Sequence, residues 1–184
     1  GTNALVVNTE GSNNTAVGMQ SLDANTSGNN NTAVGYQSLS ANITGGRNTA
    51  IGFGSLDAND AGFNTAVGYN SLGSNTSAEN NTAVGNESLA ANTTGANNTV
   101  VGSAALDANT TASNHVAVGY AALTSNTTGQ RNTAVGALSS QEITTGDDNV
   151  AMGYLSLGST TTGIENVAIG VEALQLNTTG SSNT

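Results

Sequence analysis

Apolar and polar positions along this chain follow a pattern that returns every 17 residues. Each repeat ends in Asn-Thr-Ala-Val and continues through a glycine into Tyr-x-Ser-Leu and then Ala-Asn-Thr-Thr-Gly. One step, from Gly52 to Gly68, is 16 residues long instead of 17. Counted with this glycine as position 1, the repeats begin at Gly1, Gly18, Gly35, Gly52, Gly68, Gly85, Gly102, Gly119, Gly136, Gly153 and Gly170.

Several positions of the repeat are nearly invariant in residue type. Position 5 is Leu except at Ser140, position 14 is Asn except at His115, and position 17 is always Val, Ile or Met. Charged residues fall on the variable positions. Such strict columns are typical of repeat proteins, in which each unit stacks on its neighbours.

The repeat predicts strands and turns rather than helices. Paired-helix repeats need about 33 residues or more, and glycine, Asn and Thr are poor helix formers. Thr-Ala-Val and Tyr-x-Ser-Leu predict two short strands per coil, with a turn after position 1 and a second turn over Asn-Thr-Thr-Gly-x-x. The shortened repeat reads Gly-Phe-Asn at its end, so we place its missing residue in the second turn, between Gly62 and Asn64.

The sequence therefore predicts an all-β fold, a parallel β-solenoid or β-roll of about ten to eleven 17-residue coils. Residues 1–184 form a single repeat domain. Coils spaced by the distance between neighbouring strands, about 4.8 Å, would make a rod of roughly 50 Å.

Stacking places equivalent side chains in columns. We expect the Leu and Val columns to form a thin core, although strand alternation puts Ala16 and Val17 on opposite faces. One apolar column alternatively faces outward, which would favour self-association. The position-14 asparagines are expected to form an amide ladder, in which each donor meets an acceptor on the next coil. Its members are Asn14, Asn31, Asn48, Asn64, Asn81, Asn98, Asn132, Asn149 and Asn166.

Composition excludes several classes of partner. The only basic side chains are Arg47 and Arg131, against twelve carboxylates, and the formal net charge is −10. A nucleic-acid surface needs many basic side chains, and an anionic membrane surface attracts them as well. No apolar run approaches the ~18 residues of a membrane helix, so we expect no membrane insertion by this segment.

Candidate catalytic chemistry is sparse. His115 is the single histidine and there is no cysteine, which leaves no usual zinc ligand set. Asp23, Asp57 and Asp107 share position 6 but never occupy adjacent coils. Paired-carboxylate catalysis needs two carboxyl groups within about 5–10 Å. We therefore expect no enzymatic activity, no cofactor and no metal, and we assign His115 to the polar ladder.

An aromatic column occupies position 2. Aromatic rings can stack on sugars, so these side chains are candidate ligand-facing residues, and shielding of the neighbouring turn is the simpler explanation. The candidates are Tyr36, Phe53, Tyr69, Tyr120 and Tyr154.

The phrase N-[TV]-A-[VI]-G-x-x-[SA]-L, as in NTAVGYQSL and NVAIGVEAL, resembles the YadA-like head repeats of trimeric autotransporter adhesins. It is also similar to repeats in related bacterial and phage fibre proteins. The resemblance implies a left-handed, homotrimeric β-roll that is a fragment of a longer surface or tail fibre. It implies an extracellular, cell-surface or virion location, and a surface glycan or another host receptor as a partner besides the chain itself.

Two alternative functions stay open. The position-15 threonines, which include Thr15, Thr32 and Thr49, form a column at repeat spacing that would suit ice binding. The position-2 aromatics would alternatively bind glycans. A glycan-degrading solenoid is disfavoured because the acidic residues are not clustered.

Overall fold

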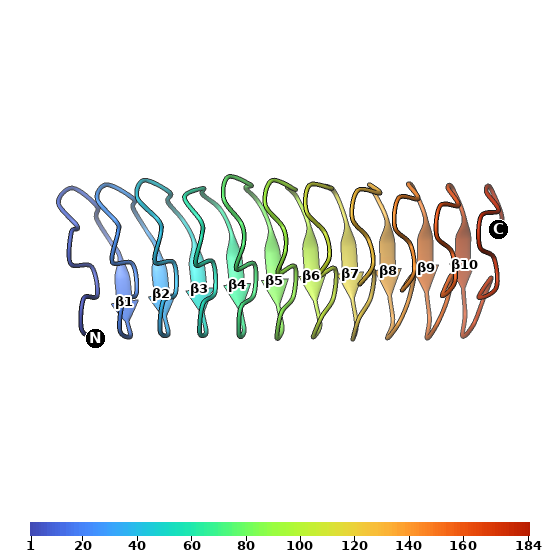
Figure 1. Ribbon diagram of the computed structural model, residues 1–184, viewed down its shortest axis with the longest axis horizontal. Helices are drawn as coiled ribbons and strands as arrows, with labels where there is room; N and C mark the ends of the chain where they lie inside the picture. Colours follow the sequence, from blue (N-terminus) through green and yellow to red (C-terminus); the bar gives the residue numbers. More distant parts are fainter.

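The computed structural model describes residues 1–184 as a straight rod of stacked coils (Figure 1). Ten strands, one from each successive coil, lie side by side in chain order in a single parallel sheet, which confirms the predicted β-solenoid. Each strand pairs in register with its equivalent on the next coil, as Thr32 does with Thr49. The strands are β1 (Thr15–Val17), β2 (Thr32–Val34), β3 (Thr49–Ile51), β4 (Thr65–Val67), β5 (Thr82–Val84), β6 (Thr99–Val101), β7 (Val116–Val118), β8 (Thr133–Val135), β9 (Val150–Met152) and β10 (Val167–Ile169).

Each coil contains one strand, so the predicted second strand over Tyr-x-Ser-Leu is wrong. Positions 3 and 5 adopt the left-handed conformation, with φ of 52° at Gln37 and 55° at Leu39. Their N–H groups still bond to neighbouring coils, Gln37 to the carbonyl of Met19 and Leu39 to that of Ser55. A thin coil has to bend every few residues in order to close. Hydrogen bonding between coils therefore holds even Leu in a region that residues with a Cβ seldom adopt.

Glycine at position 1 is required by close packing between coils. Gly35 has a φ of 138°, and a Cβ at this residue would lie 2.3 Å from the carbonyl oxygen of Gly52 on the next coil. Any other residue would have to push the two coils apart. This contact explains why the column is never interrupted.

The core consists of the Leu column and the central residue of each strand, which is alanine in nine strands and Val100 in β6. Leu39, Ala50 and Leu56 are among the 17 residues of the main buried cluster. The predicted Val contribution to the core is wrong, because side chains alternate along a strand and position 17 points away from the interior. Only the central residue of a three-residue strand faces inward, and alanine suits the narrow interior.

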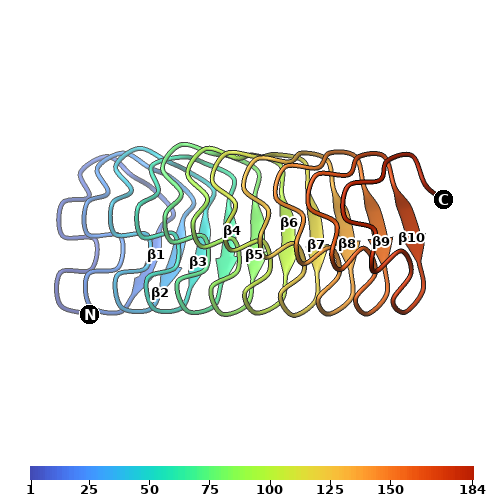
Figure 2. The ribbon, with the colours of Figure 1, turned by 45° about the vertical axis from the view of Figure 1, so that its right-hand side comes forward.

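The strands form one wall of the rod, and the remainder of each coil closes the other sides (Figure 2). The outer surface of this wall carries the Thr column of position 15 beside the Val, Ile and Met column of position 17. Ile169 is 69% exposed and Val17 is 56% exposed. No helix able to cross a membrane is present.

Candidate functional site

The position-2 aromatics divide into one stack and two separate rings. Tyr36, Phe53 and Tyr69 lie on consecutive coils, with ring centroids 5.2 and 5.3 Å apart. Both faces of Phe53 are therefore covered by its neighbours. Tyr120 and Tyr154 stand apart, because Ser103 and Ala137 occupy neighbouring places in the column.

This arrangement affects what the aromatic column can bind. Stacking of a sugar needs an uncovered ring face, and the three-ring stack presents mainly ring edges to solvent. Tyr120 is 60% exposed, and no aromatic residue lies beside it in the column. Tyr120 is the most exposed of the candidate aromatics and therefore the one most open to a ligand.

The position-14 asparagines form a buried column with a regular pattern of bonds. The backbone N–H of Asn48 donates to Oδ1 of Asn31 at 2.9 Å. The Nδ2 of Asn31 donates to the carbonyl of Gly45 at 2.9 Å. The column is thus held mainly by amide-to-backbone bonds between coils. The expected amide-to-amide bonds appear only near its end, for example from Nδ2 of Asn166 to Oδ1 of Asn149.

A second asparagine column, at position 8, was not singled out from the sequence. Here the side-chain amides bond directly to one another, with Nδ2 of Asn42 donating to Oδ1 of Asn25 at 3.0 Å and Nδ2 of Asn109 donating to Oδ1 of Asn92 at 2.8 Å. The near-invariance of this Asn was the available signal, but Asn is also common in turns. A role in a turn therefore explained this Asn from the sequence, and the buried ladder that it forms was not predicted.

His115 lies within the position-14 column. Its backbone N–H donates to Oδ1 of Asn98 at 3.0 Å, and its Nδ1 accepts the N–H of Asn132 at 3.2 Å. The imidazole thus replaces the amide oxygen, whereas its buried Nε2 has no partner. Burial lowers the pKa of His115 to about 4.

The shortened coil is missing a residue next to Asp60, and the predicted gap after Gly62 is wrong. Nδ2 of Asn48 bonds to the carbonyl of Ala61, as Asn31 does to that of Gly45, so Ala61 keeps position 11. The missing residue is therefore at position 10. Since the flanking Gly-Phe-Asn resembled a shortened Gly-x-x-Asn, sequence alone placed the loss too late.

Asp60 compensates for the missing residue. In an intact coil the carbonyl of Thr144 accepts the N–H groups of Thr127, Thr128 and Gly129 from the coil before. At the short coil, Oδ1 of Asp60 accepts the equivalent three N–H groups at 2.7, 2.7 and 3.2 Å. Partial burial raises the pKa of Asp60, but these hydrogen bonds outweigh it, so the net pKa is lowered.

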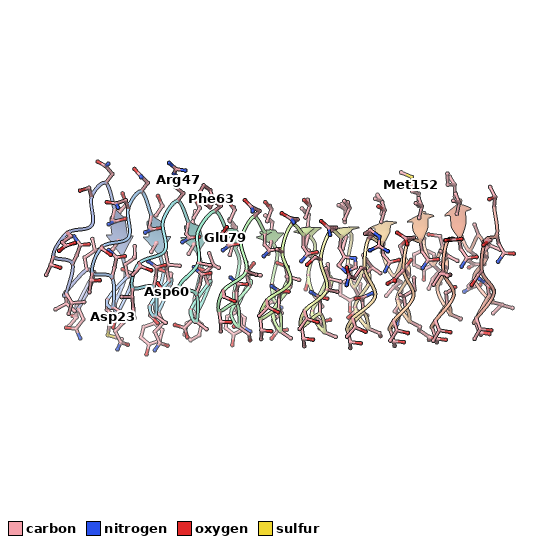
Figure 3. All side chains as sticks on the ribbon, turned by 90° about the horizontal axis from the view of Figure 1, so that it is seen from above. Asp23, Arg47, Asp60, Phe63, Glu79 and Met152 are labelled. Atoms are coloured by element: carbon pink, nitrogen blue, oxygen red, sulfur yellow. The ribbon has the colours of Figure 1, made fainter.

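A hollow of about 430 Å³ lies beside this short coil. Arg47, Phe63 and Glu79 line it together with Asp60. The Arg47 guanidinium lies over the Phe63 ring, 5.1 Å from its centroid. Figure 3 shows these side chains in the N-terminal half of the rod, far from Met152.

The other acidic candidates support turns. Asp57 accepts the hydroxyl of Ser40, and Asp107 accepts that of Thr124 at 2.7 Å. Asp148 pairs with Arg131 through two bonds of 2.6 and 2.8 Å. No group of three side chains suited to holding a metal ion is present.

No protein-family model, curated protein or solved structure matches this chain.

Proposed function

We propose that this chain is a segment of a homotrimeric, extracellular fibre that presents or forms a surface-binding region. The observation that carries the proposal is the outer wall of the sheet, where an apolar column runs over all ten strands. Its members are Val17, Val34, Ile51, Val67, Val84, Val101, Val118, Val135, Met152 and Ile169.

This column supports self-association for a geometric reason. Apolar side chains repeat at the strand spacing of about 4.8 Å, so the column extends over roughly 40 Å. Continuous exposed apolar surface of this kind is typical of protein interfaces. A second rod has the same spacing between coils, so its apolar column can contact this one at every coil. Closed symmetric association then buries the column on every chain.

The remaining features are those of a spacer. Hydrogen bonds between coils continue along the entire rod, and each coil contacts mainly its two neighbours, as in other repeat proteins. Length and stiffness therefore follow from the number of coils. The left-handed trimer, the surface location and the receptor are parts of the proposal that stem from the resemblance to adhesin head repeats.

Light scattering on a size-exclusion column tests the proposal. We expect a mass three times that of the 18.0 kDa chain. Val84→Asp places a charge in the apolar column and should reduce the mass to that of one chain. Thr94→Asp, on an exposed turn, is the matched control and should leave the mass unchanged. A wild-type chain that elutes as a monomer contradicts the fibre proposal.

Ice binding is a second candidate, and one observation favours it. The position-15 column faces outward on the flat wall, and its first six members are all threonine, from Thr15 to Thr99. The trimer interface would cover the same wall, so the two functions exclude each other there. Thermal hysteresis of a monomeric chain would favour ice binding, and its absence would remove this candidate.

A further inference from the structure

The short coil interrupts a second hydrogen-bonding pattern, at position 12. In four intact coils the N–H of this position donates to a position-12 side chain of the next coil. The N–H of Ser12 donates to Oδ1 of Asn29 at 2.7 Å, and that of Ala96 donates to Oγ of Ser113 at 3.0 Å. A side-chain oxygen thus caps the turn of the coil before it.

Two glycines remove these caps beside the hollow. Positions 12 of the third and fourth strand-bearing coils are Gly46 and Gly62, and neither has a side chain that could accept a bond. The N–H groups of Asn29 and Gly46 consequently donate to no protein atom. The N–H of Gly62, which is buried, also has no acceptor, because the Glu79 side chain does not bond to it. The N–H of Glu79 is unpaired as well, since Ala96 on the next coil has no side-chain acceptor. Between Ala96 and Ile164 such unpaired groups occur singly, at Ser113 and Asp147.

These donors converge on the hollow, which forms an open trough between Asn29 and Glu79. In the intact pattern each N–H points to where the next position-12 side chain would lie, and here that space is the hollow. Asn29 closes one end and Glu79 the other, three coil spacings or about 14 Å apart. Arg47 and Phe63 form one side, and Thr44 and Asp60 form the other. A volume near 430 Å³ lies in the usual range of small-molecule sites, roughly 300–1,000 Å³.

Arg47 supplies a cation with no acidic partner. Arg131 is engaged by Asp148 and lies near Asp147, whereas Arg47 makes no ion pair. Its guanidinium covers the Phe63 ring and keeps its donors for a ligand. Unpaired N–H groups beside a guanidinium are complementary to an oxyanion.

A carboxylate fits this turn better than other anions. Oδ1 of Asp147 accepts the N–H of Gln130 at 2.7 Å, at the equivalent place in an intact coil. A carboxylate oxygen therefore suits the geometry. Asp60, Glu79 and the net charge of −10 oppose a dianion such as phosphate more strongly than a monoanion.

The remaining lining matches hydroxyl groups. Asn29, Asn30 and Thr44 can donate and accept hydrogen bonds, and Glu79 accepts them. Phe63 is 48% exposed and offers apolar contact. We propose that the trough binds a carboxylate-bearing sugar, with the carboxylate on Arg47 and the unpaired N–H groups. This site goes beyond the fibre proposal and does not depend on it.

Titration of the ¹⁵N-labelled full chain with sodium glucuronate tests the site. We expect saturable shifts at the amides of Asn29, Gly46 and Gly62, at least about tenfold weaker binding of acetate, and no saturable shift with glucose. Absence of saturable shifts with glucuronate overturns the proposal. Acetate as tight as glucuronate overturns the sugar assignment, and an equal response to glucose overturns the carboxylate assignment.

Three variants locate the binding. Arg47→Gln should weaken glucuronate binding about tenfold or more, because a charged hydrogen-bond partner is lost. Gly46→Ser places a hydroxyl in the trough, as Ser113 does in its own coil, and should also weaken binding. Arg131→Gln, on a distant coil, is the control and should bind as the wild type does. Equal affinity of Arg47→Gln and the wild type contradicts the assigned site. Since glucuronate binding is read from amide shifts, the result is independent of whether the chain forms trimers.

Discussion

At the scale of single residues, His115 is the one member of the position-14 column with a side chain that can be protonated. The position-14 ladder contains otherwise only asparagine. Its Nδ1 accepts a backbone N–H, so protonation there would break a bond between coils. Burial also disfavours the charged ring and lowers the pKa of His115 to about 4 from 6.5.

This shift predicts a loss of stability in mild acid. The folded pKa lies below the unfolded value, so the unfolded chain binds the proton more readily between about pH 6.5 and 4. The stability that the folded chain has with a neutral His115 is fully present above pH 6.5, and it is lost as the pH falls from 6.5 toward 4. We expect about 2 kcal/mol less stability at pH 5 than at pH 7, measured by urea denaturation.

His115→Asn is the matched control for this prediction. Asparagine restores the column and cannot titrate, so this variant should keep nearly the same stability at pH 5 and pH 7. Equal losses in the variant and the wild type would show that another group causes the pH dependence.

At the scale of one coil, the repeat that begins at Gly136 exchanges two residue types. Ser140 stands in the Leu column, and Ile143 stands in the position-8 Asn column. Both are buried, and Ile143 belongs to the main apolar cluster. The larger side chain at one position compensates for the smaller one at the other. Hydrogen bonding is incomplete at this coil, because Ser140 Oγ and both amide atoms of Asn126 lack partners.

A double-mutant cycle tests this compensation. Ser140→Leu alone adds volume beside Ile143 and should destabilise the chain by about 1–3 kcal/mol. Ile143→Asn alone removes apolar volume and should destabilise it by a similar amount. The double variant restores both columns, so we expect a favourable coupling of about 2 kcal/mol in urea denaturation. Additive effects would show that the two positions are independent.

At the scale of the whole molecule, the same coil divides the apolar core. The main cluster of 17 residues ends at Ile143, and a second cluster contains only Ala151, Leu157 and Ala168. In a repeat protein, stability is the sum of coil terms and nearest-neighbour interfaces. A weak interface therefore uncouples the coils on its two sides.

Hydrogen exchange should reveal this division. We expect the amides of β9 to exchange about tenfold faster or more than those of β5, because opening beyond Ile143 leaves the main cluster intact. NMR-detected exchange at neutral pH measures the difference. In the Ser140→Leu, Ile143→Asn variant the two strands should become more similar. Uniform protection in the wild type would mean that the rod opens as one unit.

Much of the fold was predictable, whereas the candidate sites were predictable only in part. The period and the Leu column led directly to parallel stacking, because identical units can bury their apolar side chains only against their own copies. Strand propensity misled at Tyr-x-Ser-Leu, where coil closure requires φ near +50° at Leu39 and its equivalents. The trough could not be predicted from the sequence. Whether an N–H is unpaired depends on the side chain of a residue 16 or 17 positions away, on the next coil.

The sequence by itself determined the 17-residue period, the parallel register and the identity of the side chains in each column. These follow because a strict repeat makes every coil the template for the next. Only the tertiary structure decided which column faces inward, where the shortened coil loses its residue, and how the Asp60 side chain replaces a backbone carbonyl as acceptor. Those outcomes depend on how a narrow coil closes and on which donors then find acceptors, and this balance is set between coils rather than along the chain.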